Sequence, residues 1–247
     1  MSILDQIVKN KREEVKSLGD IPTPDFCPTD FKGIFEVKPF LIAEVKAKSP
    51  SEGAIVDDFD PMAQASKYIC GAANAISVLT DEMYFGGSFE ILKNIRNLTF
   101  LPLLCKEFIV DPKQVRMARH CGADLVLLIV KILSEEDLKT LKEEIEKWGM
   151  KALIEVQNEE ELNRALRVEP ELLLINNRNL TSFEVDMKTT SRLLADIPLH
   201  IKVIAASGIK DPSETRTFPP RVDGFLIGTS LMRSENPAEF LRQCRET

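Results

Sequence analysis

The sequence FLIAEVKAKSP at residues 40–50 decides the fold, because it opens a pattern that recurs to the end of the chain. In each cycle a short apolar run precedes a polar turn and a helix-like segment with apolar residues three or four positions apart. The runs are apolar on both alternations, as parallel strands covered on both faces require. The eight predicted strands span residues 40–45, 75–79, 101–105, 125–130, 152–156, 172–175, 201–205 and 224–227.

Helix starts and strand spacing favour closure of these strands into a barrel. Asp60, Asp111, Asp211 and Asn236 each precede a proline, which places an acceptor at the N-cap and proline at the first helical position. Successive strands begin roughly 20 to 35 residues apart, as strand–loop–helix–loop units need. An open doubly wound sheet shares this alternation, but no glycine-rich dinucleotide motif follows the first strand. We therefore predict an α/β fold, namely a (β/α)8 TIM barrel.

The length of 247 residues is typical of one such barrel, so we expect residues 1–247 to form a single domain. Ahead of the first strand, Ser2 can cap a helix that ends at Gly19 and carries the apolar residues Ile3, Leu4, Ile7, Val8, Val15 and Leu18. A proline-containing stretch follows this helix. We expect residues 1–39 to be an N-terminal helical extension that packs on the barrel.

Charge and composition argue against several classes of partner. The net charge is −7 and no Lys/Arg cluster stands out, so the sequence predicts no binding to nucleic acid or to an anionic membrane. The charged N-terminus has no apolar leader, and no apolar run approaches the roughly 18 residues of a membrane span, which indicates a cytoplasmic protein. No partner-protein segment is evident, and monomer and dimer both stay open. A small anionic ligand remains compatible with a locally positive pocket.

Cysteine and histidine usage gives no sign of a metal centre. The five cysteines are scattered without C-x-x-C spacing, which indicates reduced thiols. Only two histidines are present. We therefore expect neither structural zinc nor a histidine-bound metal.

Charged residues at the ends of the predicted strands are the candidates for catalysis, because active sites of these barrels lie at the carboxyl ends of the strands. Glu44 and Lys46 share strand parity and therefore point the same way. A charge inside an apolar run is costly to bury unless it is paired or functional. Lys131 also follows a strand, but we interpret it as a solvated surface residue. The candidates are Glu44, Lys46, Lys106, Glu155, Asn176 and Arg178.

Two loops have the composition of a phosphate site. Residues 207–209, SGI, follow the seventh strand, and residues 228–230, GTS, follow the eighth, where phosphate-binding barrels supply backbone N–H groups. Glycine in either loop alone can simply permit a tight turn, but the two together favour phosphate. Residues 49–53, SPSEG, can close over the same group as a mobile loop, although a plain turn uses the same residues.

These segments together resemble the indole-3-glycerol phosphate synthase family. The most specific is IAEVKAKSPS at residues 42–51, which resembles the first-strand signature of that family. The resemblance covers all eight strands and the extension. It implies an enzyme without a cofactor that closes the ring of 1-(2-carboxyphenylamino)-1-deoxyribulose 5-phosphate, with loss of carbon dioxide and water, in tryptophan biosynthesis. The other segments are ISVLT at 76–80 with Tyr84 and Phe85, KEFI at 106–109, LIEV at 153–156, NNRNL at 176–180 and GTSLM at 228–232.

The resemblance also implies a role for each candidate. Lys106 would be the general acid, Lys46 would bind the aromatic carboxylate under the control of Glu44, and Glu155 would transfer protons during dehydration. Asn176 and Arg178 would position the substrate or neighbouring acids. The expected aromatic pocket consists of Phe85, Phe108 and Leu128. The expected phosphate site consists of Ser49, Ser207, Gly208, Gly228 and Thr229.

One position departs from the family pattern and leaves alternatives open. Where the seventh strand of the family carries a glutamate before Ser-Gly, this chain has Ala206. By resemblance that glutamate faces the substrate and the catalytic lysine, so its loss would cost roughly 1.5 to 3 kcal/mol, or about one to two decades in rate. A catalytically impaired barrel that still binds the phosphorylated ligand is therefore the alternative function. A Schiff-base aldolase would instead need a lysine of strongly lowered pKa among Lys46, Lys106 and Lys131.

Overall fold

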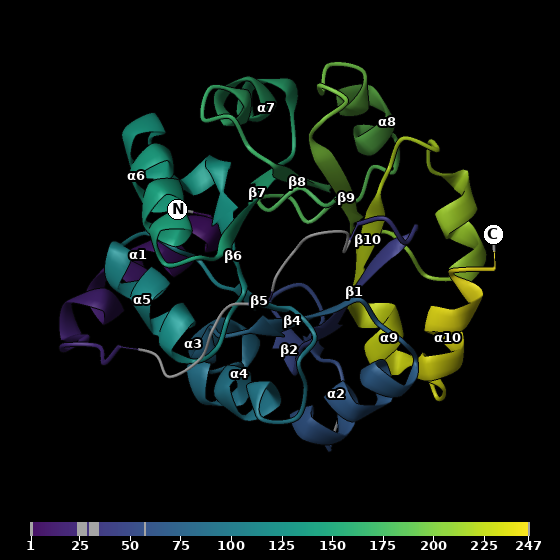
Figure 1. The fold of residues 1–247 in the computed structure, drawn as a ribbon, viewed down its shortest axis with the longest axis horizontal. Coiled ribbons are helices and arrows are strands. Elements are labelled where there is room, and N and C mark those ends of the chain that lie inside the picture. Colours follow the sequence, from purple (N-terminus) through teal and green to yellow (C-terminus); the bar gives the residue numbers. More distant parts are fainter. Residues whose placement is uncertain (1, 24–28, 30–34, 57, 247) are drawn as a thin grey trace.

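The computed structural model describes residues 2–23, 29, 35–56 and 58–246, and it confirms the predicted TIM barrel (Figure 1). Eight parallel strands close in the order β1-β10-β9-β8-β7-β6-β5-β4. A separate antiparallel pair, β2 (Lys48–Ser49) and β3 (Gly53–Ala54), lies in the loop after β1. The barrel strands are β1 (Phe40–Val45), β4 (Ala75–Leu79), β5 (Leu103–Lys106), β6 (Leu125–Ile129), β7 (Lys151–Val156), β8 (Leu172–Asn176), β9 (Lys202–Ala206) and β10 (Gly224–Ile227).

Helices surround the barrel and follow its strands in turn (Figure 1). Asp60, Asp111 and Asn236 cap α2, α5 and α10 as predicted, each with proline at the start of the helix. Asp211 caps a 3-10 helix, η2, and not the α-helix that the pattern predicted. The helices are α1 (Ile3–Ser17), α2 (Pro61–Cys70), α3 (Glu82–Phe85), α4 (Phe89–Arg96), α5 (Pro112–His120), η1 (Val130–Ile132), α6 (Glu135–Lys147), α7 (Glu159–Leu166), α8 (Lys188–Leu194), η2 (Pro212–Thr217), α9 (Thr229–Arg233) and α10 (Pro237–Gln243).

The bounds of β1, β4 and β10 match the prediction, and the other strands differ by one or two residues at an end. The largest difference is in β5, which begins at Leu103 and not at Leu101. Pro102 has no N–H to give to the ladder, although its carbonyl accepts a hydrogen bond from the amide of Ile76 at 3.0 Å. The start of this strand is therefore set by the proline.

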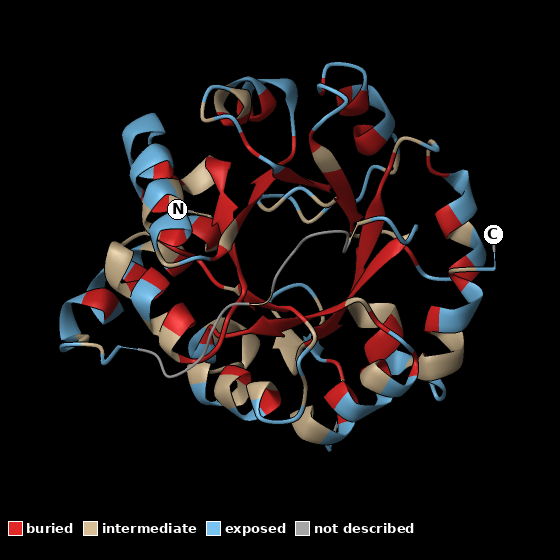
Figure 2. Cartoon of the chain, viewed as in Figure 1, coloured by how far each residue is buried: buried red, intermediate tan, exposed pale blue. Residues whose placement is uncertain are grey.

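Two hydrophobic clusters divide the core, and Figure 2 shows the barrel strands buried and the outer sides of the helices exposed. Alternate residues along each strand belong to different clusters, as the two-residue period of a strand requires. On β1, Leu41 and Ala43 pack toward the helices, whereas Phe40 and Ile42 pack inside the barrel. Glu44 shares the parity of Phe40 and Ile42, so its carboxylate points into the barrel interior.

The helix of the N-terminal extension packs against the interior cluster of the barrel. Ser2 caps α1 in a capping box with Asp5. Leu4 and Ile7 are buried in the same cluster as Leu127 of β6. Residues 1, 24–28 and 30–34 of the expected extension lie outside the described residues. The described part of the extension thus contributes to the core instead of standing apart from it.

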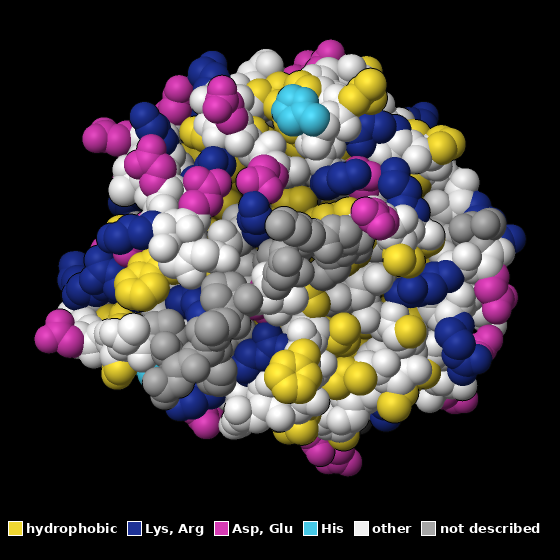
Figure 3. All heavy atoms as spheres, viewed as in Figure 1, with side chains coloured by type: hydrophobic (Ala, Val, Ile, Leu, Met, Phe, Trp, Pro, Cys, Tyr) yellow, Lys and Arg dark blue, Asp and Glu magenta, His cyan; other side chains and the backbone are white. Residues whose placement is uncertain are grey.

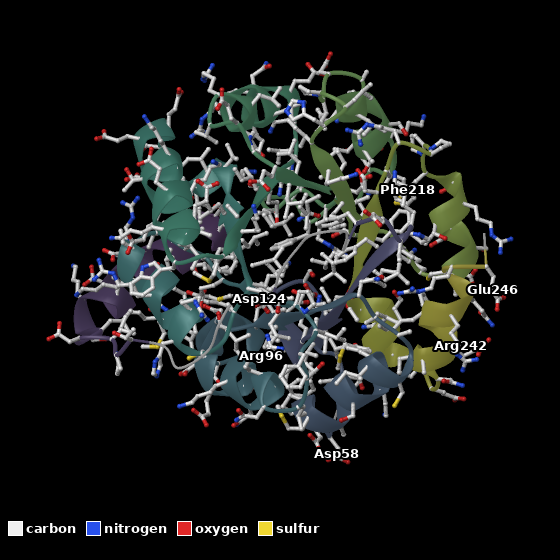
Figure 4. All side chains as sticks on the ribbon, in the orientation of Figure 1. Asp58, Arg96, Asp124, Phe218, Arg242 and Glu246 are labelled. Carbon is white, nitrogen blue, oxygen red and sulfur yellow. The ribbon has the colours of Figure 1, made fainter. Side chains whose placement is uncertain are left out.

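A buried ion pair joins α4 to the loop that precedes β6. Asp124 accepts a 2.7 Å hydrogen bond from Arg96, and Figure 4 labels both side chains. Asp124 also accepts from the amide of Leu103 at the start of β5. This cluster lies at the amino ends of the strands, where such barrels place stabilising residues and not catalytic ones.

Among the described helices, none is long and apolar enough to cross a membrane. Four cysteines, Cys70, Cys105, Cys121 and Cys244, are free thiols, and Cys27 lies outside the described residues. Within the described ranges, no group of three or more His, Cys, Asp or Glu side chains is placed to hold a metal ion.

Candidate active site

A cavity of about 1180 Å³ lies at the carboxyl ends of the barrel strands. Lys106, Asn176 and Ala206, which end β5, β8 and β9, all line it. The structure therefore brings together residues that are far apart in the sequence. Every predicted site residue except Leu128 lines this cavity: Glu44, Lys46, Ser49, Phe85, Lys106, Phe108, Glu155, Asn176, Arg178, Ser207, Gly208, Gly228 and Thr229.

The floor of the cavity carries a carboxylate held between two ammonium groups. Glu44 is 2% exposed, and its two oxygens lie 2.8 Å from Lys46 Nζ and 3.3 Å from Lys106 Nζ. Burial would raise the pKa of Glu44, but the charges of Lys106 and Lys46 outweigh burial and lower this pKa to about 2. Glu44 is therefore ionised at neutral pH. It holds both lysines at fixed positions on one side of the cavity.

Lys106 is held in its charged form by its neighbours. Burial would lower the pKa of Lys106, but the carboxylates of Glu44 and Glu155 outweigh burial and raise this pKa above its ordinary value. A lysine that stays protonated can donate a proton or stabilise a developing oxyanion. A nucleophilic lysine would need the opposite shift. The electrostatics of Lys106 thus favour acid catalysis over Schiff-base chemistry.

A second buried carboxylate belongs to Glu155 on β7. Its Oε1 accepts a 2.9 Å hydrogen bond from Asn176 Nδ2 at the end of β8. The side-chain oxygen Oδ1 of Asn176 in turn accepts from the backbone amide of Arg178 at 3.0 Å. These bonds fix the orientation of the Asn176 amide and, through it, the position of the carboxylate. Glu155 and Lys106 both line the cavity, and each is held by a neighbouring side chain.

Aromatic and aliphatic side chains line one wall of the cavity. Phe85 at the end of α3 and Phe108 after β5 have ring centroids 5.8 Å apart. Leu128 was predicted to complete this wall, and that prediction is wrong. Leu128 packs between the barrel and its helices, while its neighbours Leu127 and Ile129 line the cavity. Because side chains alternate along a strand, a shift of one residue moves the side chain to the other face.

The opposite side of the cavity is formed by backbone-rich loops. Gly208 has a φ of +97° and Ser207 a φ of +66°, so the loop after β9 adopts a conformation that favours glycine. The side chain of Ser230 donates to the carbonyl of Ile209 at 2.7 Å, which ties the loop after β10 to the loop after β9. Gly228 packs on the charged floor, because a Cβ there would lie 2.4 Å from Glu44 Oε1. The two predicted phosphate loops are thus tied to each other, and the loop after β10 lies beside Glu44.

Comparison with known proteins identifies the family. The family model for indole-3-glycerol phosphate synthase matches residues 4–244. The chain belongs to the indole-3-glycerol phosphate synthase family. It is 46% identical over 258 residues to indole-3-glycerol phosphate synthase of Rippkaea orientalis, covering 97% of this chain and 88% of that protein. It is 41% identical to the enzyme of the same name from Petrotoga mobilis, covering 95% of this chain and 93% of that protein.

Solved structures with the same fold are more distant in sequence. KGPDC from Streptococcus mutans aligns with a TM-score of 0.64 at 14% identity, covering 84% of this chain and 96% of that chain. Thiamine phosphate pyrophosphorylase from Pyrococcus furiosus aligns with a TM-score of 0.62 at 19% identity, covering 85% and 95%. At these identities the likeness shows the shared barrel alone. The family assignment rests on the sequence matches.

Indole-3-glycerol phosphate synthases are carboxy-lyases of tryptophan biosynthesis that act on a phosphorylated small molecule. The resemblance implies that the family carries a glutamate at the end of this strand, where this chain has Ala206. Ala206 ends β9, is 4% exposed and lines the cavity beside Asn176, its partner in β8. Position 206 thus faces the cavity, as the resemblance implies for the glutamate, but here it carries only a methyl group.

Some residues of the synthase cavity were not predicted as site residues. Glu52, in the loop after β1, lies 3.9 Å from Arg178 and 3.2 Å from Arg233, so it bridges two cations at the rim. Arg233 sits at the end of α9 and carries no sequence signal beyond its position after the GTSLM segment. Lys131 agrees with the surface interpretation, because its Nζ donates to Thr181 in a second, shallow cleft outside the main cavity.

Proposed function

We propose that this chain catalyses the indole-3-glycerol phosphate synthase reaction with Lys106 as its general acid. The observation that carries this proposal is the Glu44 carboxylate, which holds Lys46 and Lys106 side by side in the barrel interior. The aromatic wall lies on one side of this pair and the glycine-containing loops on the other. This order suits a substrate with a carboxyphenyl group at one end and a phosphate at the other.

Ring closure needs an anchored substrate and a proton for the ketone oxygen. In the proposed arrangement Lys46 binds the aromatic carboxylate while Phe85 and Phe108 contact the ring. The ring carbon that bears the carboxylate attacks the ketone carbon, and Lys106 gives its proton to the ketone oxygen as the new bond forms. Loss of carbon dioxide returns an electron pair to the ring.

Dehydration then removes the hydroxyl group formed in the first step. That group leaves as water with one added proton, and the substrate loses a second proton as the new double bond forms. We assign proton transfer in this step to Glu155, which Asn176 holds in place. Arg178 lines the same part of the cavity and is proposed to orient the substrate. At the phosphate end, backbone N–H groups around Gly208 and Gly228, with Ser49, Ser207 and Thr229, are proposed to bind the phosphate.

We propose that the enzyme works without a cofactor or a metal, because the proposed steps consist of proton transfers and loss of carbon dioxide and need no redox group. Dialysis against a chelator should then leave turnover unchanged.

We also propose that residues 1–247 form one domain, with residues 1–39 as its extension, and that the protein acts in the cytoplasm. Acidic and basic side chains are interspersed on the face drawn in Figure 3. With the net charge of −7, we propose that the protein binds neither nucleic acid nor an anionic membrane.

The proposal is tested by incubating the purified protein with 1-(2-carboxyphenylamino)-1-deoxyribulose 5-phosphate and following indole fluorescence. We expect saturable formation of indole-3-glycerol phosphate. Substrate binding without product would replace this proposal by the catalytically impaired barrel. Borohydride reduction in the presence of substrate should leave the protein unlabelled, and a labelled lysine would support the aldolase alternative.

A further inference from the structure

A buried lysine of the N-terminal helix lies between two carboxylates of the barrel. Lys11 is on α1, and its side chain is 4% exposed. Its Nζ lies 2.9 Å from Asp81 Oδ2 and 3.3 Å from Glu107 Oε1. Glu14, one turn further along α1, approaches the same Nζ at 2.7 Å from a more exposed position. One ammonium group therefore connects the extension to the loops that follow β4 and β5.

Asp81 sets the conformation of the segment that carries Phe85. Its Oδ1 accepts hydrogen bonds from the amides of Tyr84 at 2.7 Å and Phe85 at 3.2 Å, so it caps the short helix α3. Its backbone carbonyl accepts from the amide of Gly87 at 2.8 Å. Within the described part of the chain, the partner of Oδ2 is the ammonium of Lys11. The charge of this capping carboxylate is thus compensated from the extension.

Glu107 sets the conformation of the segment that carries Lys106 and Phe108. It follows Lys106 directly, is 2% exposed, and accepts from the amide of Phe108 at 2.8 Å. Its other oxygen accepts from the side chain of Thr80 at 3.0 Å, next to Asp81. The backbone between Lys106 and Phe108 is therefore held by the same ion cluster as Asp81.

Two buried carboxylates in one cluster need a cation. Burial raises the pKa of Glu107, and the charge of Lys11 acts against this rise. The thiol of Cys105 on β5 also lies close to Glu107, and because burial raises its pKa well above the ordinary value, this thiol stays neutral. Without the ammonium, Asp81 and Glu107 would repel each other in a place that excludes water. The two loops would then separate, or one carboxyl group would take up a proton.

We propose that Lys11 is a positioning residue of the synthase site, whose ammonium holds the loops after β4 and β5 so that Phe85 and Phe108 clamp the aromatic ring beside Lys106. This inference rests on the proposed function for what the site binds. Among the described residues, no hydrogen bond or ion pair joins this cluster to the loops after β9 and β10. Lys11 should therefore matter for the aromatic end of the substrate and not for its phosphate.

The test compares Lys11→Met with Lys16→Met, which changes an exposed lysine of the same helix paired with Glu13. Misplacement of reacting groups by about 1 Å costs on the order of a hundredfold, so we expect Lys11→Met to lower kcat/KM by about ten- to a hundredfold. The inhibition constant of inorganic phosphate should stay unchanged. Lys16→Met should behave as the parent enzyme in both measurements.

Two further readouts separate positioning from general damage to the fold. The loss in Lys11→Met should shrink as the pH falls, because protonation of one carboxyl group removes the repulsion. Adding Glu107→Gln to Lys11→Met should recover activity, since an amide can still accept from Phe108 and no longer carries a charge. Equal kcat/KM in the two lysine variants, or a loss that neither low pH nor Glu107→Gln reduces, would overturn the inference.

Binding of anthranilate, the 2-aminobenzoate that corresponds to the carboxyphenylamino end of the substrate, keeps this test independent of turnover. An inactive parent enzyme would contradict the proposed function, whereas the inference would still be decided by the dissociation constant for anthranilate. We expect that constant to rise about tenfold or more in Lys11→Met and to stay the same in Lys16→Met, by the same misplacement argument. Equal constants in both variants would refute a positioning role for Lys11.

Discussion

Replacing Glu44 by glutamine removes the charge that holds Lys46 and Lys106 together while keeping the size of the side chain. In the parent protein Glu44 lies 2.8 Å from one ammonium and 3.3 Å from the other. The amide of glutamine can accept a hydrogen bond from one lysine, but it cannot neutralise either. The two cations would then repel each other across the floor of the cavity, and we expect Lys106 to move away from its proposed position.

The magnitude follows from the strength of the interactions that are lost. The pKa of Glu44 falls from an ordinary 4.5 to about 2, which at about 1.4 kcal/mol per pKa unit corresponds to about 3 kcal/mol in favour of the ionised form. A single hydrogen bond to a charged group contributes roughly 1.5 to 3 kcal/mol. If the loss appears in the transition state, kcat/KM should fall by about one to two decades.

The pH dependence of this variant distinguishes electrostatics from packing. Because Glu44 raises the pKa of Lys106, its removal lets Lys106 lose its proton at a lower pH. The alkaline limb of the kcat/KM profile should therefore move to lower pH in Glu44→Gln. The assay is indole-3-glycerol phosphate formation by fluorescence across the alkaline range. A reduced rate with an unmoved alkaline limb would show that Glu44 does not tune Lys106.

Two further substitutions and a stability measurement on Glu44→Gln test neighbouring parts of the site. Ala206→Glu should raise kcat/KM by about one to two decades, with a smaller gain for Ala206→Gln, and no gain in steady-state assays would mean that the existing carboxylates suffice. Gly228→Ala places a Cβ 2.4 Å from Glu44 Oε1 and should lower kcat/KM at least about tenfold, whereas Gly19→Ala, with nothing within 4 Å, serves as the silent control. The lowered pKa of Glu44 contributes stability that is complete above pH 4.5 and is lost as the pH falls toward about 2, so urea unfolding should show a weaker acid dependence in Glu44→Gln.

Much of the barrel could be predicted because its strands are buried on both faces. A parallel strand covered on both sides consists of a short, nearly continuous apolar run, and such runs were located within two residues at each end. The carboxyl end of each run then indicated where polar side chains meet. Glu44 and Glu155 each interrupt an apolar run, so a charge marks one alternation of β1 and one of β7.

The prediction for Leu128 failed because β6 contains no such marker. All five residues of β6 are apolar and buried, so the sequence alone does not distinguish the inward alternation from the outward one. In the structure Ile129 of β6 pairs with Glu155 of β7, and this register shows which residues of β6 point inward. That pairing comes from tertiary structure.

The position of Lys11 in the sequence is itself a signal of its burial. The buried residues of α1 are Leu4, Ile7, Lys11 and Val15, which lie three or four positions apart on one face of the helix. A lysine in the middle of such a stripe is either exposed by a local bend or paired with buried carboxylates. The partners, Asp81 and Glu107, follow two separate strands and could not be assigned to it from spacing.

Lys106→Met tests whether Lys106 supplies the proton for ring closure. Lys131→Met is the matched control, because Lys131 also follows a barrel strand but lies outside the main cavity. The measurement is the single-turnover rate of indole-3-glycerol phosphate formation, together with competition by inorganic phosphate. We predict that Lys106→Met abolishes turnover and keeps phosphate binding, while Lys131→Met retains both. Turnover at the parent rate in Lys106→Met would contradict the account.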